Sequence, residues 1–229
     1  MFKAVVEFFQ SYNPMTLTIL RDATIETLIM VGASTALASF AGLPVGILLA
    51  TTSKDHILEQ SFLNRILGGI VNLGRSIPFI ILMVAIIPFT RKVAGTSIGT
   101  TAAIVPLTVA AVPFVARLVE GAFLEIDSGV IEAAESMGAS PLQIIFKVMI
   151  PEALPALILA VTMTSVNLIG YSAMAGAIGG GGLGDLAIRY GYQRFRGDIM
   201  LQTVIILVVL VQGIQMLGDK IAQRLYHRK

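Results

Sequence analysis

Long apolar stretches alternate with short polar segments along this chain, and five of the apolar stretches approach or exceed the length needed to cross a membrane. A bilayer core about 30 Å thick requires roughly 20 predominantly apolar residues in a helix. We therefore predict an all-α membrane protein with five transmembrane helices, over residues 25–51, 66–89, 98–119, 154–177 and 199–217.

Composition supports a membrane protein and removes several kinds of chemistry. Charged residues make up 13% of the chain, against about a quarter in soluble domains, and the mean hydropathy is +0.85. The absence of cysteine excludes disulfides and thiolate metal sites. His56 and His227 lie far apart in the sequence, so we expect no catalytic residue, metal or cofactor. The scattered charges, net +2, favour no nucleic-acid partner.

The ends of the chain differ from the apolar spans. Residues 1–12 alternate apolar and polar groups too briefly to span a membrane, and they predict a short helix in the bilayer interface. They contain Lys3 and Glu7 and no small-residue cleavage site, so we expect no signal peptide. We divide the chain into an N-terminal interfacial segment (1–20), a transmembrane domain (21–220) and a basic cytoplasmic tail (221–229).

Glycine and proline occur inside several predicted spans. Pro44, Pro78 and Pro106 are among them, and Gly42 and Gly46 form a G-x-x-x-G pair in the first span. Such a pair allows two helices to approach closely. Ordinary kinks and small packing residues are the alternative interpretation, because neighbouring helices satisfy the backbone groups that a proline leaves free.

The distribution of basic residues indicates how the predicted bundle is oriented in the membrane only at the C-terminal tail. With a cytoplasmic C-terminus, eight basic residues lie inside and seven outside, and Arg75 remains within the second span. That difference is too small for the positive-inside rule. Four basic residues follow Asp219 with no acid among them, which favours a cytoplasmic C-terminus. Five spans then place the N-terminus outside and the loop between the third and fourth spans in the cytoplasm.

That loop, residues 125–151, predicts two short helices joined by a turn. Asp127 or Ser128 is a suitable N-cap for the first helix, and Gly138 permits the turn. Ser140 is a suitable N-cap for the second helix, with Pro141 as its first residue. We expect Pro151 to end that helix and an apolar stripe to attach it to the bundle, formed by Leu142, Ile145, Phe146 and Met149.

The spacing in this loop resembles the EAA loop of ABC-importer permeases, which docks into an ATPase subunit. The family pattern is EAA, three residues, Gly, nine residues, then I-x-L-P, and Val148 and Ile150 replace its Ile and Leu here. The resemblance implies an ATPase-coupling element formed by Glu132, Ala133, Ala134, Glu135, Gly138, Pro141 and Pro151. In this element, we expect the two alanines to let the partner approach and the two glutamates to offer it acceptors.

Segments outside the loop resemble the permease of bacterial methionine importers. They read RSIPFI (75–80), IPFTR (87–91), GTSIG (95–99), AIVPLT (103–108), PF with AR (113–117) and GYSAM to GLG (170–184). The resemblance implies a multi-pass subunit of the bacterial inner membrane. It also implies a permease homodimer, two cytoplasmic ATPase subunits, an extracytoplasmic methionine-binding lipoprotein and alternating access driven by ATP.

Two sequence motifs suggest enzyme chemistry that their context excludes. Gly179, Gly181 and Gly184 fit the dinucleotide fingerprint, but no strand precedes them, and we interpret them as a non-helical turn on the external side. Ser97 fits the nucleophile pattern G-x-S-x-G without an available histidine, and we expect it to cap the third span. No phosphate-binding loop occurs, so the chain is not an enzyme and ATP hydrolysis belongs to a partner.

Four polar residues are candidates for lining a translocation pathway. Asn167, Tyr171 and Ser172 lie in the fourth span, where helix–helix hydrogen bonds would account for them equally well. Arg75 is a charge inside a span, which favours a functional role. The alternative is that its side chain extends to the cytoplasmic interface.

Other functions compete with an ATP-driven methionine importer. An ion-coupled carrier needs a mid-span acid, whereas Glu26 and Glu120 lie at the ends of predicted spans. A non-transporting scaffold would not require the spacing of the polar loop. Among importers, another small amino acid or a methionine derivative is the alternative cargo.

Overall fold

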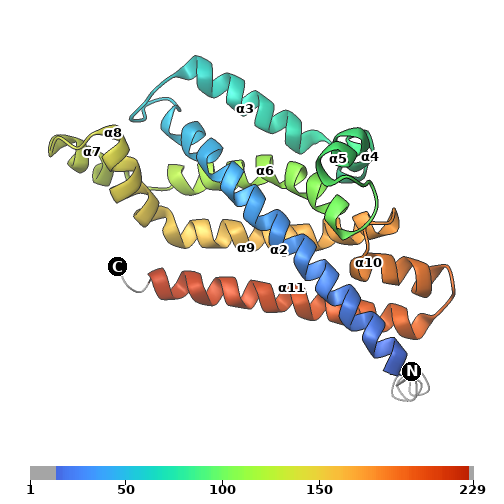
Figure 1. Ribbon diagram of the computed structural model, residues 1–229. Helices are drawn as coiled ribbons and strands as arrows, with labels where there is room; N and C mark the ends of the chain where they lie inside the picture. The colour runs from blue at the N-terminus through green and yellow to red at the C-terminus, as the bar shows by residue number, and fades with distance from the viewer. Residues whose placement is uncertain (1–13, 227–229) are drawn as a thin grey trace. The chain divides into compact units, whose positions relative to one another are not determined.

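The computed structural model describes residues 14–226, and this part of the chain consists of helices and turns without a β-strand (Figure 1). The elements follow one another in the order α2 (Pro14–Thr51), α3 (Ser61–Ser76), α4 (Phe79–Ala85), α5 (Ile87–Ala94), α6 (Thr100–Leu124), α7 (Ser128–Ser136), α8 (Pro141–Ile144), the π-helix η1 (Ile145–Met149), α9 (Ile150–Ala177), α10 (Gly182–Leu186), the π-helix η2 (Ala187–Tyr192) and α11 (Gly197–Tyr226).

Four helices of the described chain are long and apolar enough to cross a membrane, and the bent pair α3 and α4 forms a fifth candidate. They coincide in order with the five predicted spans. The helices extend beyond the predicted bounds: α2 begins eleven residues earlier, at Pro14, and α11 continues nine residues further, to Tyr226. At 1.5 Å per residue α2 is about 57 Å long, so it extends beyond a hydrocarbon core of about 30 Å.

The predicted span over residues 66–89 corresponds to the bent pair of α3 and α4, whose two helices meet at 98°. α3 ends at Ser76, Ile77 is extended (φ −84°, ψ 121°), and α4 begins after Pro78. The physical reason is Pro78, because a proline ring disfavours the α-helical conformation in the residue before it. Pro44, Pro106 and Pro113, by contrast, lie inside the continuous helices α2 and α6.

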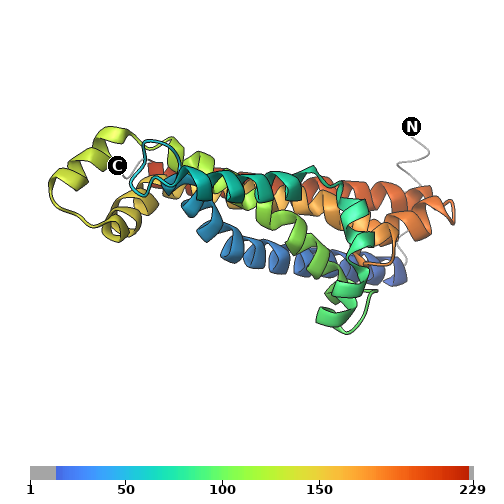
Figure 2. The same ribbon diagram turned by 90° about the horizontal axis from the view of Figure 1, so that it is seen from above.

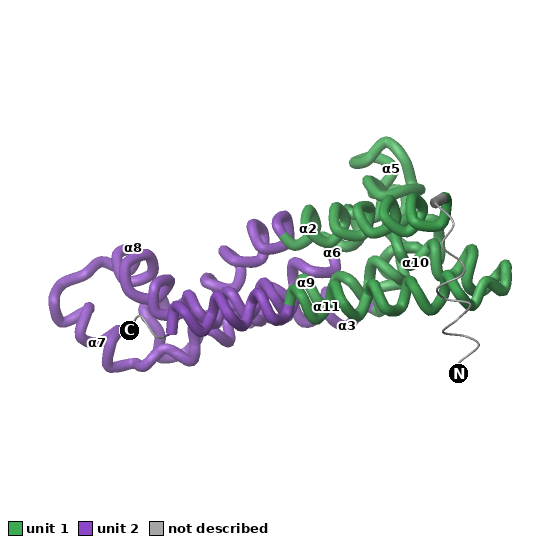
Figure 3. The backbone as a smooth tube through the Cα atoms, turned by 90° about the horizontal axis from the view of Figure 1, so that it is seen from below, with its two compact units in different colours: residues 1–35, 78–109, 165–214 green, residues 36–77, 110–164, 215–229 purple. Residues whose placement is uncertain are grey.

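The chain divides into two compact units, coloured separately in Figure 3. Unit 1 contains residues 1–35, 78–109 and 165–214, and unit 2 contains residues 36–77, 110–164 and 215–229. One cluster of buried apolar side chains in unit 1 comprises Leu20, Ala23, Leu183, Leu186 and Ile199. Its members come from α2, α10 and α11, so these three helices pack together within the unit.

In unit 2 the close helix contact expected for Gly42 and Gly46 is present. A β-carbon at Gly42 would lie 2.8 Å from the β-carbon of Val115, and one at Gly46 would lie 2.6 Å from the carbonyl oxygen of Ala116. Only glycine leaves room for α6 at these two positions of α2. The pair is therefore a helix-packing motif.

The predicted terminal segments change in two respects. Residues 14–20 of the proposed interfacial segment are the first turns of α2, and residues 221–226 of the proposed tail are the last turns of α11. Hydrophobic length places a span but does not mark where its helix ends, because a helix continues into water wherever its backbone bonds are satisfied. The predicted interfacial helix over residues 1–12 lies outside the described residues.

Candidate functional site

The polar loop between α6 and α9 forms a helical hairpin at the end of unit 2 (Figure 2). Asp127 is the N-cap of α7, because its carboxylate accepts the backbone N–H of Gly129 at 2.7 Å. Gly138 has φ +80°, a conformation that side chains with a β-carbon disfavour. The amides of Met137, Gly138 and Ala139 bond back to α7 carbonyls. The predicted first helix and its turn are confirmed.

The second helix of the hairpin begins with a capping box. The Ser140 hydroxyl accepts the N–H of Gln143, and the Gln143 side chain accepts the N–H of Ser140 at 2.9 Å. Pro141 occupies the first helical position, where its missing N–H would have no partner in any case. Both ends of the turn are therefore fixed by local hydrogen bonds, which makes the hairpin a well-defined projection.

The expectation that Pro151 ends this helix is wrong. α8 continues through the π-helical turn η1 directly into α9, and Pro151 is the second residue of α9. A proline in a regular helix clashes with the carbonyl four residues earlier. Just before Pro151 the regular pattern is replaced, since the N–H of Ile150 bonds to the carbonyl of Ile145, five residues earlier. The hairpin is consequently joined to a membrane helix through one uninterrupted helical segment.

Half of the predicted apolar stripe is wrong. Ile145 and Met149 are buried, but Leu142 and Phe146 are each 66% exposed, and Ile144 is buried instead. Leu142 and Phe146, four residues apart, share an exposed face of the helix, and Ile145 and Met149, also four residues apart, share a buried one. Two of the four side chains therefore attach the helix to unit 2, and the other two remain exposed.

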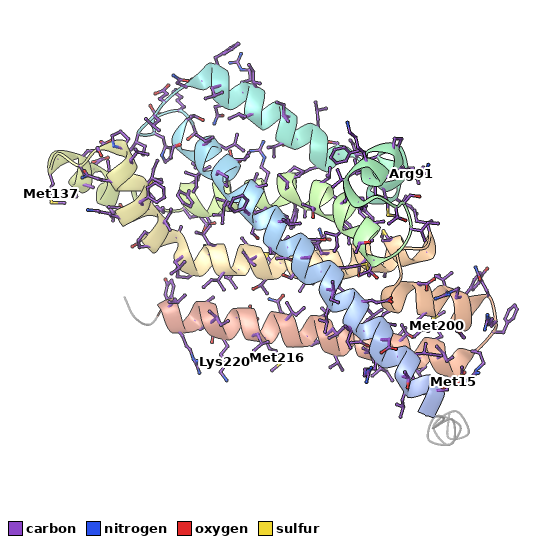
Figure 4. The ribbon with its side chains drawn as sticks, in the orientation of Figure 1. Met15, Arg91, Met137, Met200, Met216 and Lys220 are labelled. Atoms are coloured by element: carbon purple, nitrogen blue, oxygen red, sulfur yellow. The ribbon has the colours of Figure 1, made fainter. Side chains whose placement is uncertain are left out.

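The outward surface of the hairpin is formed by residues on both sides of Gly138. Glu132, Ala133 and Glu135 are exposed on α7, and Met137 at the tip is 81% exposed (Figure 4). Ala134 does not offer a partner its side chain as expected, since it is buried within the chain together with Ile131. The small side chain of Ala134 packs inside unit 2. The small side chain of Ala133 is exposed and leaves the surface of α7 without a large projection.

The three candidate pathway residues in α9 belong to unit 1 and have different surroundings. Tyr171 stacks on Phe79 with ring centroids 4.6 Å apart. Ser172 is buried and donates its hydroxyl to the carbonyl of Ile169, so it bonds within its own helix. Asn167 is half-buried and makes no side-chain hydrogen bond to the described residues. A role in lining a pathway stays a prediction for all three.

Arg75 belongs to unit 2 and is exposed in the last turn of α3. It lies fourteen residues from the start of α3 at Ser61, about 21 Å along the helix. Both interpretations of Arg75, a functional role and a side chain that extends to the cytoplasmic interface, stay predictions. Arg75 lies two residues before the break at Ile77. The sequence signal for that position is Pro78, which would have to be interpreted as the end of the helix.

The glycine-rich segment is a tight turn, as expected, and a contact missed in the sequence holds it. Gly179, Gly181 and Gly182 all have positive φ. The Glu26 carboxylate accepts the N–H of Gly182 at 2.7 Å, and the Thr27 hydroxyl accepts the N–H of Leu183 at 2.9 Å. Glu26 is thus engaged well inside α2. The sequence signal for this contact was an acidic residue within an apolar helix and a glycine-rich segment elsewhere in the chain.

A second contact joins α3 and α6 within unit 2. Arg117 pairs with Glu120 at 2.5 Å and also donates to the side chain of Asn72 at 2.9 Å. Glu120 is buried, and a buried carboxylate is stable only with a partner. Arg117 on the same helix provides the matching positive charge. The expected cap at Ser97 is wrong: α6 begins at Thr100, and Ser97 accepts a hydrogen bond from Arg91.

Apolar helices long enough to span a membrane, with a rigid polar hairpin between the third and fourth of them, define a multi-span transport component of a membrane. The chain belongs to the family of binding-protein-dependent transport system inner membrane components, which it matches over residues 42–227.

Individual relatives agree with this family. The chain is similar to the probable D-methionine transport system permease protein MetI of Vibrio cholerae, with 55% identity over 99% of each chain. It is 46% identical to the methionine import system permease protein MetP of Bacillus subtilis, over 93% of this chain and 96% of that one. A solved structure of the inward-facing MetNI methionine ABC transporter has a TM-score of 0.91 and 49% identity, covering 93% of this chain and 99% of that chain.

Proposed function

We propose that this chain is the permease subunit of an ATP-driven methionine importer of the bacterial inner membrane. Two copies form the pathway, two cytoplasmic ATPase subunits drive it by alternating access, and an extracytoplasmic methionine-binding lipoprotein delivers the cargo. The observation that carries the proposal is the α7–α8 hairpin: it is capped at both helix starts and continuous with α9. A rigid lever with an exposed tip is what force transmission from a soluble partner requires.

The surface of the hairpin favours a protein partner over open solvent. Val130, Met137, Leu142 and Phe146 are between 42% and 81% exposed, alongside Glu132 and Glu135. Apolar side chains mixed with acceptors on a projecting hairpin suit a groove with a hydrophobic floor and basic or N–H-rich walls. This surface supports Glu132, Ala133, Glu135 and Gly138 as the coupling residues of the permease.

The ion-coupled carrier is the second candidate and the engaged acids disfavour it. Glu26 accepts a backbone N–H and Glu120 pairs with Arg117. A proton relay needs a carboxylate that exchanges its proton during transport, and both of these hold structural contacts. Another small amino acid or a methionine derivative stays the alternative cargo.

Uptake in membrane vesicles tests the function. Vesicles carrying the permease, the ATPase and the binding protein should accumulate labelled methionine only with ATP, and the ATPase should co-purify with the permease. Uptake that persists after ATP depletion would contradict an ATP-driven importer. Stronger uptake of another amino acid would show that the cargo is that amino acid and not methionine.

Two matched glycine variants test the hairpin. A β-carbon at Gly138 or at Gly121 meets nothing within 4 Å, but only Gly138 has positive φ. Gly138→Val should therefore distort the turn and lower methionine uptake more than ATP hydrolysis, while Gly121→Val should leave coupling intact. If both variants keep the same ratio of methionine uptake to ATP hydrolysis, the turn at Gly138 does not transmit force.

The absence of cysteine from the chain allows a clean test of orientation. We propose an external N-terminus and a cytoplasmic hairpin, so Met137→Cys should react with an impermeant maleimide only after permeabilisation, and Phe195→Cys should react in intact cells. Added ATPase should protect Met137→Cys. The reverse labelling pattern would invert the topology.

A further inference from the structure

Unit 1 contains an open cavity of about 410 Å³ that no part of the proposed function uses so far. α4, α5, the start of α6, the end of α9 and the glycine turn form its walls. Its volume lies within the range of about 300–1,000 Å³ that small-molecule sites occupy. The predicted topology places this end of α5 and α6 on the external side.

The cavity is apolar along most of its wall and polar in one region. Met83, Ile98 and Pro106 represent the apolar wall. Thr90, Arg91 and Ser97 provide the polar side chains. A site with this distribution suits a small ligand that combines an apolar chain with a polar end.

Thr90 supplies evidence that the polar region lacks a partner. Its residue is 4% exposed, and its hydroxyl oxygen is buried with no hydrogen bond to the described residues. A buried hydroxyl without a partner loses its hydrogen bonds to water without replacing them, and native structures keep few such groups. Thr90 also lines the cavity, so a hydroxyl without a partner lies beside the space that a ligand would fill.

Arg91 and the start of α6 favour an anionic group in this region. Arg91 (Figure 4) makes a hydrogen bond to Ser97 at 3.4 Å and has no carboxylate partner among the described residues. The cavity also reaches Gly99 and Ala102 at the N-terminus of the 25-residue helix α6. The first turn of a helix offers free N–H groups and a partial positive charge.

We infer that this cavity is a binding site of the permease itself for the transported amino acid. Arg91, Ser97 and the start of α6 hold the carboxylate, Thr90 adds a hydrogen bond, and the apolar side chain of the cargo lies against Met83, Ile98 and Pro106. The inference rests on the proposed function, because it takes methionine as cargo. It assigns cargo recognition to residues outside the four pathway candidates predicted from sequence.

Equilibrium binding of labelled methionine to the permease–ATPase complex in nanodiscs, without the binding protein, tests this site. Arg91→Gln should weaken binding about tenfold or more, since a hydrogen bond to a charged group contributes about 1.5–3 kcal/mol. Thr90→Val, which keeps the shape of the side chain, should weaken it severalfold. Lys92→Gln is the matched control, because Lys92 is an exposed cation next to Arg91 that does not line the cavity.

Methioninol, which lacks the carboxylate, separates recognition from a general structural effect. It should bind the wild-type complex as weakly as methionine binds the Arg91→Gln complex, and Arg91→Gln should not weaken it further. Arg91→Lys should recover part of the affinity for methionine. Size-exclusion profiles and basal ATPase activity identify variants that fail to assemble, and Ser97→Ala then replaces Arg91→Gln as the variant measured.

The outcomes separate this site from the proposed function. If wild-type vesicles import methionine but Arg91→Gln and Thr90→Val bind it as the wild type does, the site is wrong and the function stands. If methionine is not imported and another amino acid is, the cargo is wrong, and the same variants decide the site with that amino acid. An anionic phospholipid retained by the wild type and lost in Arg91→Gln, with methionine binding unchanged, would make the cavity a lipid site and overturn the inference.

Discussion

Two glycines of α2 allow a sharp test of the helix packing in this protein. A β-carbon at Gly32 would meet nothing within 4 Å, whereas one at Gly46 would lie 2.6 Å from both the carbonyl oxygen of Ala116 and the β-carbon of Val119. Both positions lie inside the same helix, so Gly32→Ala and Gly46→Ala change its intrinsic propensity alike. The two variants differ in what the new methyl group meets.

The size of the difference follows from these contacts. Replacing glycine by alanine in a helix contributes up to about 1 kcal/mol at either position. At Gly46 the obstructing atoms belong to the backbone and a β-carbon, which cannot move without shifting α6. Overpacking of this kind costs about 1–3 kcal/mol. Because the propensity gain is common to both variants, Gly46→Ala should be about 1–3 kcal/mol less stable than Gly32→Ala.

Unfolding of the purified permease in mixed micelles with increasing sodium dodecyl sulfate, followed by far-UV circular dichroism, measures this difference. Gly32→Ala should unfold at or above the wild-type midpoint and Gly46→Ala below it. Equal midpoints would mean that α2 and α6 do not approach as closely at Gly46 as these contacts require, and would refute the packing argument.

Three further perturbations test local contacts. Glu26→Gln should lower the stability of the glycine turn by about 1 kcal/mol, because the charge-assisted hydrogen bond to Gly182 becomes a neutral one; unchanged amide exchange at that turn would contradict it. Arg117→Gln leaves Glu120 buried without its cation and should cost about 2–3 kcal/mol in the same detergent titration, while Glu120→Gln alone should cost less. Asp127→Ala removes the cap of α7 and should speed amide exchange in that helix by an amount equivalent to about 1 kcal/mol, with membrane insertion unaffected.

The hairpin shows which local features can be read from sequence. The caps at Asp127 and Ser140 and the turn at Gly138 were predicted and are confirmed. Each depends on residues within three or four positions of one another, and side-chain oxygens bond nearby amides whatever surrounds them. The continuation of the helix through Pro151 was missed, because a π turn arises from the packing of the whole segment and has no short sequence signal.

The candidate sites divide along the same line. The hairpin residues that we propose for coupling were predicted from their spacing along the chain, and the structure changed only how some of them face. Glu26 was dismissed as lying at the end of a span, yet it bonds Gly182, 156 residues away in the sequence. The sequence does not mark Thr90 and Arg91 as site residues, because only the cavity distinguishes a buried hydroxyl from an ordinary helical threonine.

The sequence by itself determined that this protein is a membrane-spanning helical bundle with a capped polar hairpin after its third span. Hydrophobic length carries this information because a bilayer offers no water to unpaired backbone groups, so apolar stretches of about 20 residues must become helices. Tertiary structure alone decided which glycines admit a neighbouring helix, which acid holds the glycine turn and where a polar region opens within apolar walls. These features depend on atoms brought together from distant segments, and the order of residues along one segment does not encode them.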